Sequence, residues 1–487
     1  MEKHIQKLEK QLIACILDGV STGSIDTKRA RELAGVALEI VANQEASGPM
    51  ERSLVLLEQY PEFSTIVEVA RKNAEGSISD KQWYIEKGLH VALSAIDGIA
   101  TAKKTLQAMW DGTLFLQEEK ILGKKNERPD MSMVCLGEEE IFQMLRGEKQ
   151  KEVGNGQQRK IGVVLLGGAQ AGCVSAGLLQ GMADVGVLDR VDGFFGVSAG
   201  ALVAMYVAAG NGLDGARIVF EDNTRDDFIM LSKNRKEASA HLAKLLMGEA
   251  APVIDTTAFA RRATTTRPLD IEKLINLEKD VYVVVTNVDT GKPEYINISG
   301  GYIVTNTKEV EQLGYTDFLK THNNILQVMS GSVCVPVLST EPYTTMENGA
   351  KYADGGITDF VPLQFAYSQG YTDLLVLSNC PLQAETNIMD VFLYGIIAQM
   401  AKNQGLYPEA FVLQCKQLIS NRVASLRYME DLLADTQSNE LQRVAVIAPE
   451  VNTVGLLEKD GDLLKKVYEH CRLFSQNLFA SGDNPLL

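Results

Sequence analysis

The stretch GFFGVSAGALVAMYVA, residues 193–208, decides the fold of this chain. It opens with a short apolar run that has the length of a buried strand, and it closes with an apolar run typical of a buried helix. Between the two, Gly196 and Gly200 flank Ser198 in the spacing G-x-S-x-G. Such a turn strains the serine and leaves room only for small neighbours. We therefore predict that Ser198 is a nucleophile at the carboxyl edge of a sheet, with the amides of the next helix directed at it.

A second glycine-rich turn follows the apolar run at 161–166, where the sequence reads LGGAQAG from Leu166 to Gly172. Glycines let backbone amides approach a ligand closely, and the start of a helix attracts anions. The spacing matches neither the dinucleotide fingerprint nor the P-loop. Beside a serine nucleophile an oxyanion hole is the better interpretation, although a plain strand-to-helix turn would use the same glycines. The expected residues are Gly167, Gly168 and Ala169, with Gly172 supporting the turn.

An aspartate followed by two glycines is a candidate partner for the serine. The sequence Asp354-Gly355-Gly356 suits a carboxylate held where the backbone is crowded, although Asp-Gly is also a common turn pair. A serine triad adds a histidine, and only His470 follows Asp354 in the chain, within a helical pattern. We therefore expect the histidines to be surface or packing residues: His4, His90, His241, His322 and His470.

The pattern after residue 160 predicts an α/β fold. Short runs of β-branched and other apolar residues alternate with helical patterns, which is typical of βαβ units and a mostly parallel sheet. The predicted buried strands are 161–166, 193–197, 281–286, 374–377 and 444–448, with an edge strand at 294–299.

Three regions can be separated along the chain. Residues 1–146 have helical periodicity and few strand signals, which indicates a helical N-terminal region. Residues 147–159 are polar and contain glycine, as a linker does. Residues 160–480 carry the candidate site, and the helical patterns at about 387–442 are an insertion or packing elements of that same domain.

Composition excludes several classes of function. The formal net charge is −16, whereas a nucleic-acid-binding protein needs a positive footprint, so we expect no nucleic-acid partner. Seven scattered cysteines without a CxxC pair favour free thiols, and we expect no disulfide framework, metal site or cofactor. The charged start of the chain lacks a signal peptide, and no apolar run reaches the ~20 residues of a membrane span. We expect a cytoplasmic chain, with signal-less export as an open alternative.

The three turns, in this order, resemble those of the patatin-like phospholipases. The segment QVMSGS at 327–332, leading to Pro336, is similar to the family's A-S-x-x-x-P segment, and Pro362 follows the Asp-Gly-Gly turn as in the family. The resemblance covers about residues 160–480. It implies a three-layer sandwich around a mostly parallel central sheet, to which this chain adds its N-terminal α-helical region.

The resemblance also implies a reaction without histidine. In it, Ser198 would form an acyl-enzyme, Asp354 would act as the base, and the amides at 167–169 would hold the oxyanion. Two positions differ from the family's G-G-G-x-R/K-G turn, because Ala169 replaces the third glycine and Ala171 replaces the basic residue.

The resemblance leaves several functions open. The leading interpretation is a hydrolase of fatty-acyl esters of phospholipids or lysophospholipids, with peripheral membrane contact. The alternatives are a hydrolase or acyltransferase for soluble acyl esters, and a patatin-fold binding protein with weak or no activity. The helical N-terminal region could serve as a lid, as a membrane-docking lobe or as the site of a protein activator.

Overall fold

The computed structural model describes residues 131–151, 158–230, 252–305, 312–313, 321–382, 401, 404–434, 442–451 and 453–480. The chain divides into two units, Met1–Gln107 and Ala108–Leu487, and all described residues belong to the second. The predicted helices before residue 131 therefore lie outside the described residues.

The described strands form one mixed sheet in the order β1-β11-β10-β2-β3-β4-β5-β6-β7. From β11 to β4 all neighbours are parallel, while β1 and the strands beyond β4 are antiparallel. Strand β9 also pairs with β4, and β8 pairs with β9. The strands are β1 (Met133–Gly137), β2 (Ile161–Leu165), β3 (Gly193–Val197), β4 (Asp280–Asn287), β5 (Lys292–Asn297), β6 (Tyr302–Val304), β7 (Gln312–Leu313), β8 (Thr344–Thr345), β9 (Lys351–Asp354), β10 (Asp373–Leu377) and β11 (Arg443–Pro449).

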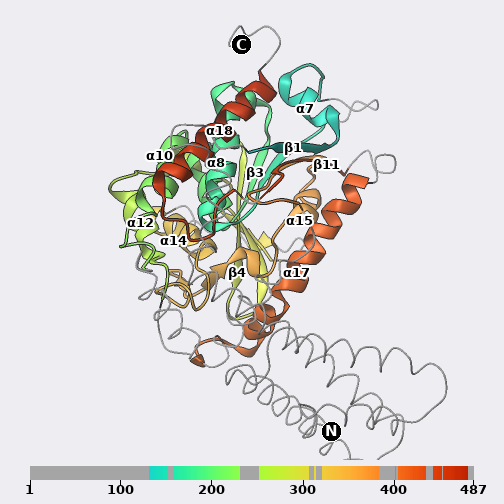
Figure 1. The fold of residues 1–487 in the computed structure, drawn as a ribbon. Coiled ribbons are helices and arrows are strands. Elements are labelled where there is room, and N and C mark those ends of the chain that lie inside the picture. Colours follow the sequence, from blue (N-terminus) through green and yellow to red (C-terminus); the bar gives the residue numbers. More distant parts are fainter. Residues whose placement is uncertain are drawn as a thin grey trace, which may run out of the picture. The chain divides into compact units, whose positions relative to one another are not determined.

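Helices cover both faces of this sheet (Figure 1). Helices α8 and α18 lie on one face and α15 and α17 on the other. The α-helices are α7 (Glu139–Arg146), α8 (Gly172–Asp184), α9 (Ala199–Ala208), α10 (Gly212–Arg217), α12 (Thr257–Thr264), α13 (Ile271–Ile275), α14 (His322–Ser332), α15 (Leu363–Ser368), α17 (Glu409–Ala434) and α18 (Gly461–Phe479). Shorter helical turns are η3 (Ala169–Ala171), η4 (Val187–Arg190), η5 (Ile218–Asp222) and η7 (Gly355–Ile357).

The parallel strands are apolar throughout because they are buried on both faces. Alternate side chains of a strand point to opposite sides of the sheet. Val163 and Leu165 of β2 therefore belong to the core shared with α8, α9 and α18, whereas Val164 and the following Leu166 belong to the core shared with α15 and α17. The predicted three-layer sandwich around a mostly parallel sheet is confirmed for this part of the chain.

Two of the predictions from the sequence are wrong: the extent of the helical N-terminal region and the place of one strand in the sheet. Residues 133–146 were assigned to the helical N-terminal region, but β1 pairs with β11, and α7 buries Ile141, Phe142 and Leu145 in the core of the sheet domain. A five-residue strand with only partial burial carries too little periodicity to be recognised. The edge strand expected at 294–299 is instead β5, which lies between β4 and β6.

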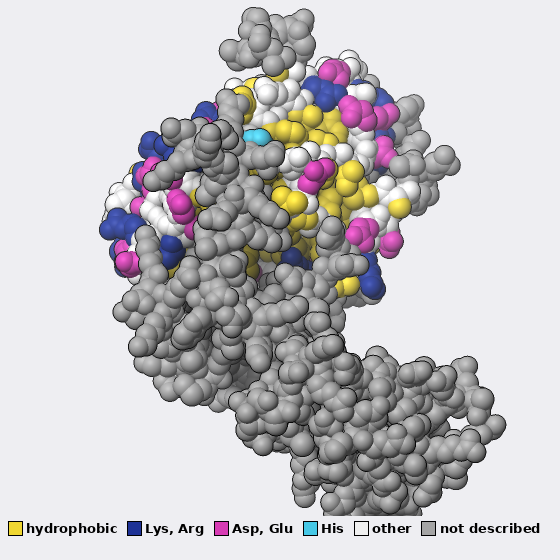
Figure 2. Space-filling model, in the orientation of Figure 1, with side chains coloured by type: hydrophobic (Ala, Val, Ile, Leu, Met, Phe, Trp, Pro, Cys, Tyr) yellow, Lys and Arg dark blue, Asp and Glu magenta, His cyan; other side chains and the backbone are white. Residues whose placement is uncertain are grey.

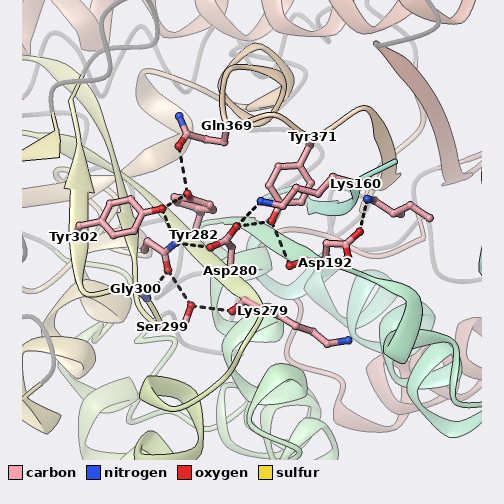
Figure 3. A network of polar contacts seen from close by, with 12 residues as sticks. Lys160, Asp192, Lys279, Asp280, Tyr282, Ser299, Gly300, Tyr302, Gln369 and Tyr371 are labelled. Atoms are coloured by element: carbon pink, nitrogen blue, oxygen red, sulfur yellow. Dashed lines mark hydrogen bonds and ion pairs between the residues drawn. The ribbon is translucent and has the colours of Figure 1, made fainter. Parts of the chain in front are cut away.

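A polar network joins the amino ends of the parallel strands (Figure 3). Asp280, the first residue of β4, accepts hydrogen bonds from Lys160 Nζ at 3.0 Å, Tyr371 OH at 2.7 Å and Asn297 Nδ2 at 2.9 Å. Tyr371 also donates to the carbonyl oxygen of Asp192, just before β3. The network therefore fixes the ends of β2, β3 and β4 at the edge of the sheet opposite Ser198.

Helices α8 and α18 pack closely because α8 presents two glycines to its neighbour. A Cβ atom on Gly177 would overlap the carbonyl oxygen of Tyr468, and one on Gly181 would overlap that of Arg472. Both obstacles are backbone atoms, which cannot rotate away as a side chain can. The approach of the two helices therefore depends on these glycines.

We expect Gly177→Ala to lower the free energy of unfolding by about 1–3 kcal/mol, because overpacking outweighs the higher helix propensity of alanine. Urea unfolding followed by circular dichroism measures the change. The matched control is Gly455→Ala, at a glycine whose added Cβ meets no atom within 4 Å. Equal stability of the two variants would contradict the packing argument.

Candidate active site

The G-x-S-x-G segment forms a tight turn between β3 and α9. Ser198 lies between them with φ 53° and ψ −125°, in the region that side chains other than glycine rarely occupy. A Cβ on Gly196 would overlap Ala201, and one on Gly200 would overlap the carbonyl oxygen of Leu165. Both glycines are therefore required for the turn. The prediction that Ser198 follows a buried strand and precedes a helix is confirmed.

Asp354 reaches Ser198 because β3 and β9 use the same edge of β4. Strand β3 ends with Val197 opposite Val284, and β9 ends with Asp354 opposite the next residue, Val285. The other edge of β4 is occupied by β5. The two strands therefore meet end to end, which places the residue after β3 beside the last residue of β9.

The hydroxyl of Ser198 donates a hydrogen bond of 2.6 Å to Asp354 Oδ2. The other carboxylate oxygen, Oδ1, accepts from the backbone N–H of Gly356 at 2.8 Å. Burial raises the pKa of Asp354 to about 6, while the hydrogen bonds from Ser198 and Gly356 oppose this shift. A carboxylate with this pKa is a better proton acceptor near neutral pH than an exposed aspartate is.

Two further side chains position this pair, and both were missed as site residues by sequence reasoning. Ser332, at the end of α14, accepts a hydrogen bond from Ser198 N at 3.1 Å and donates to Val284 O at 2.7 Å. Thr286 of β4 donates to the carbonyl oxygen of Asp354 at 2.8 Å. The G-S-x-x-x-P pattern around Ser332 was a signal for the first; a threonine within a strand gave none for the second.

The glycine-rich turn lies against Ser198. A Cβ on Gly167 would lie 3.0 Å from Ser198 Cβ, and one on Gly172 would lie 3.0 Å from the Cβ of Ala199. Within the described part of the chain, the N–H groups of Gly167, Gly168 and Ala169 have no acceptor. Free amides beside a serine hydroxyl are what an oxyanion hole requires.

Ala169 has a left-handed backbone conformation, which favours glycine over residues with a side chain. Its φ is 48°, and that of the preceding Gly168 is 152°. The next residue, Gln170, anchors the turn, since its N–H donates to Leu456 O at 3.2 Å and its Nε2 donates to Glu458 O at 3.0 Å. Ala171 is buried at the end of this turn.

The two histidines that the structure describes, His322 and His470, form no hydrogen bond to Ser198 or Asp354 among those of the described residues. His322 begins α14 and hydrogen-bonds Glu272 at 3.0 Å on the surface. His470 belongs to α18. The remaining three, His4, His90 and His241, lie outside the described residues.

We expect Ala169→Gly to raise the free energy of unfolding by about 0.5–1 kcal/mol. The left-handed conformation costs a non-glycine residue about 1–2 kcal/mol, and the greater freedom of glycine in the unfolded chain offsets part of the gain. Urea unfolding measures the difference. Ala424→Gly, on the exposed side of α17, is the control and should lose about 1 kcal/mol. Loss of stability in both variants would contradict the strained conformation of Ala169.

Comparison with known proteins assigns the segment that contains this site. Residues 163–367, from β2 to α15, match the family model described as patatin-like phospholipase. A search of curated proteins gave no match. Among solved structures, a similar chain is VipD from Legionella pneumophila, which is 14% identical, covers 57% of this chain and 69% of its own, and superposes with a TM-score of 0.25. Through residues 163–367, the chain contains a patatin-like phospholipase domain.

Proposed function

We propose that this protein is a serine acyl hydrolase that cleaves fatty-acyl esters of phospholipids or lysophospholipids, with Ser198 as the nucleophile and Asp354 as the base. The observation that carries the proposal is the 2.6 Å hydrogen bond from Ser198 Oγ to the buried carboxylate of Asp354. A serine held by a general base within hydrogen-bond reach is the arrangement that nucleophilic catalysis requires.

In the first half of the reaction, Ser198 Oγ attacks the ester carbonyl carbon while its proton passes to Asp354 Oδ2. The ester C–O bond then breaks, the proton passes to the departing alcohol, and the acyl group remains on Ser198. In the second half, Asp354 takes a proton from water, whose oxygen attacks the acyl-enzyme. Release of the fatty acid returns the proton to Ser198.

The free amides of Gly167, Gly168 and Ala169 would stabilise the oxyanion in both halves. Each donor of an oxyanion hole contributes roughly 10²–10³-fold to the rate. The start of α9 adds its own unpaired N–H groups and the positive end of its dipole. These backbone donors do not depend on the residue types that differ from the family at 169 and 171.

Apolar side chains near this edge of the sheet favour a lipid substrate. The first turns of α17 contact Gly291, in the turn that follows β4, and therefore lie at the carboxyl edge. Leu413 in these turns is 50% exposed, and Leu406, three residues before α17, is 55% exposed. Figure 2 shows further hydrophobic side chains over the upper part of the domain, where Figure 1 labels β1 and β11, rather than at the first turns of α17. Within the described residues, no helix is both long and apolar enough to cross a bilayer.

The proposal is tested by ester hydrolysis with wild type, Ser198→Ala and Asp354→Asn. The substrates are a short-chain p-nitrophenyl ester and mixed phospholipid vesicles, each with and without cell lysate as a source of activator. We expect both substitutions to lower kcat by about 10³-fold or more, because each removes a reacting group. Faster turnover of vesicles than of the soluble ester would support a lipid substrate, and the reverse would favour soluble acyl esters.

The matched control is Asp359→Asn. Asp359 is a second, partly buried carboxyl group on the same loop, and it accepts from Tyr295 OH at 2.7 Å rather than from Ser198. We expect this variant to keep wild-type turnover. If wild type turns over neither substrate under any condition, the alternative of a patatin-fold binding protein without activity would be favoured.

The pKa of Asp354 predicts the pH dependence of turnover. Because Asp354 must be ionised to accept the proton, we expect kcat/KM to rise with pH and to level off above about 6. Below that value it should fall about tenfold per pH unit. Asp359 has a similarly raised pKa, so Asp359→Asn should leave the profile unchanged if Asp354 causes it. A profile set instead by Asp359 would shift in that variant.

The same pKa predicts a pH-dependent stability. A carboxyl group whose folded pKa lies above its unfolded value destabilises the fold as pH rises through that interval, here from about 4 to about 6. Asp354→Asn removes this cost. Its amide oxygen can still accept from Gly356 N, while its Nδ2 would donate to Ser198 Oγ, the reverse of the wild-type hydrogen bond. In urea unfolding, the variant should therefore be more stable than wild type at pH 8 but not at pH 4. The same difference in free energy of unfolding between the two proteins at both pH values would contradict the raised pKa.

A further inference from the structure

Asn379 is a buried residue that lies behind the glycine-rich turn. It follows β10 by two residues, at the same edge of the sheet as Ser198, and its exposure is 2%. Its side-chain Nδ2 donates to Leu166 O at 2.5 Å and to Gly167 O at 3.3 Å, and its Oδ1 accepts from Ser175 N at 2.9 Å. The reverse orientation of the amide would place Oδ1 against two carbonyl oxygens. The partners therefore fix the orientation of the group.

These hydrogen bonds determine where two amides of the turn point. In a trans peptide the carbonyl oxygen and the N–H point in opposite directions, and no peptide in the described chain is cis. Leu166 O shares its peptide with Gly167 N, and Gly167 O shares its peptide with Gly168 N. Attraction of both oxygens towards Asn379 therefore turns both N–H groups away from it.

The opposite side of the turn is the side of Ser198. A Cβ on Gly167 would lie 3.0 Å from Ser198 Cβ, whereas a Cβ on Gly168 would lie 3.1 Å from Asn379 Cβ. The turn is thus held between the two side chains. Glycine at both positions allows the backbone itself to fill this space.

Asn379 also fixes the helix that follows the turn. Ser175 belongs to the first turn of α8, four residues after the N-cap residue Ala171. By accepting from Ser175 N, Oδ1 holds α8 to the end of β10. One side chain therefore sets the turn, the helix and the neighbouring strand in a fixed relation.

We propose that Asn379 is the positioning residue of the oxyanion hole, which directs the amides of Gly167 and Gly168 at the substrate without touching it. The inference rests on the proposed function, because an oxyanion forms only if Ser198 attacks an acyl group. The hydrogen bond from such an amide to the oxyanion forms mainly in the transition state. Substitution of Asn379 should therefore lower kcat and leave KM nearly unchanged.

The test compares Asn379→Ala and Asn379→Asp with wild type. Aspartate has nearly the same size as asparagine, but it replaces the donor with an oxygen that repels Leu166 O and Gly167 O. We expect kcat to fall about 10²-fold or more in both variants, the loss of one or more donors, with KM within about threefold. The rate at which a fluorophosphonate labels Ser198 should fall in parallel, because its phosphoryl oxygen needs the same amides.

Asn297→Ala is the matched control for a merely structural role. Asn297 is also fully buried and accepts and donates several hydrogen bonds, but it bonds to Asp280 and therefore lies at the opposite edge of the sheet. The variant Asn297→Ala should lower the midpoint of urea unfolding about as much as Asn379→Ala does. Its kcat should stay within about twofold of the wild-type value.

The outcomes separate this proposal from the proposed function. Turnover by wild type together with normal kcat in Asn379→Asp would overturn the role of Asn379 alone. An equal loss of kcat in Asn297→Ala and Asn379→Ala would also overturn this role, because the loss of kcat would then follow from lowered stability. A wild type that neither turns over esters nor is labelled by the fluorophosphonate would overturn both.

Discussion

The shared edge of β4 is the constraint on which the candidate site depends. Strands β3 and β9 occupy successive parts of that edge, opposite Val284 and Val285. This brings together Ser198 and Asp354, which are 156 positions apart in the chain. The geometry of the pair is thus set by the hydrogen-bond register of a buried sheet, which is a more rigid support than a loop would be.

The carboxyl edge of the sheet carries the features that cost stability. Ser198 and Ala169 both have positive φ, and the buried carboxylate of Asp354 has no cation among its hydrogen-bond partners in the described part of the chain. Strain of this kind persists only where surrounding structure over-determines it. The opposite edge supplies such support through Asp280 and its three donors, and the close packing of α8 on α18 adds to it. The strained residues and the buried carboxylate therefore lie at the carboxyl edge, whereas the polar network of Asp280 lies at the opposite edge of the sheet.

Much of this arrangement could be predicted from the sequence, because its signals are local. A G-x-S-x-G turn between an apolar strand and a helix identifies both elements and the residue between them, and the buried strands β2, β3, β10 and β11 were found nearly to the residue. The order of the three turns resembles that of the patatin-like phospholipases, and this resemblance implied that Ser198 and Asp354 would meet. What local signals could not give is pairing across the chain.

The missed features are all long-range. Strand β1 is short and half-exposed, and only its pairing with β11 makes it part of the sheet. Strand β9 is short and was not predicted, since its last residue, Asp354, begins the Asp-Gly-Gly segment that is typical of a turn. Ser332, Thr286 and Asn379 act through hydrogen bonds to backbone atoms of distant segments, which no spacing in the sequence reveals. A polar residue just after a buried strand, as at Asn379, is the one weak signal that was available.

The central claim is that Ser198 is a nucleophile activated by Asp354 without histidine. The most direct measurement is peptide mapping by mass spectrometry after a brief reaction with a fluorophosphonate, carried out on wild type and on Asp354→Asn. We expect one adduct in wild type, on the peptide that contains Ser198, and almost none in Asp354→Asn. An adduct on another residue, or equal labelling of Ser198 in both proteins, would contradict it.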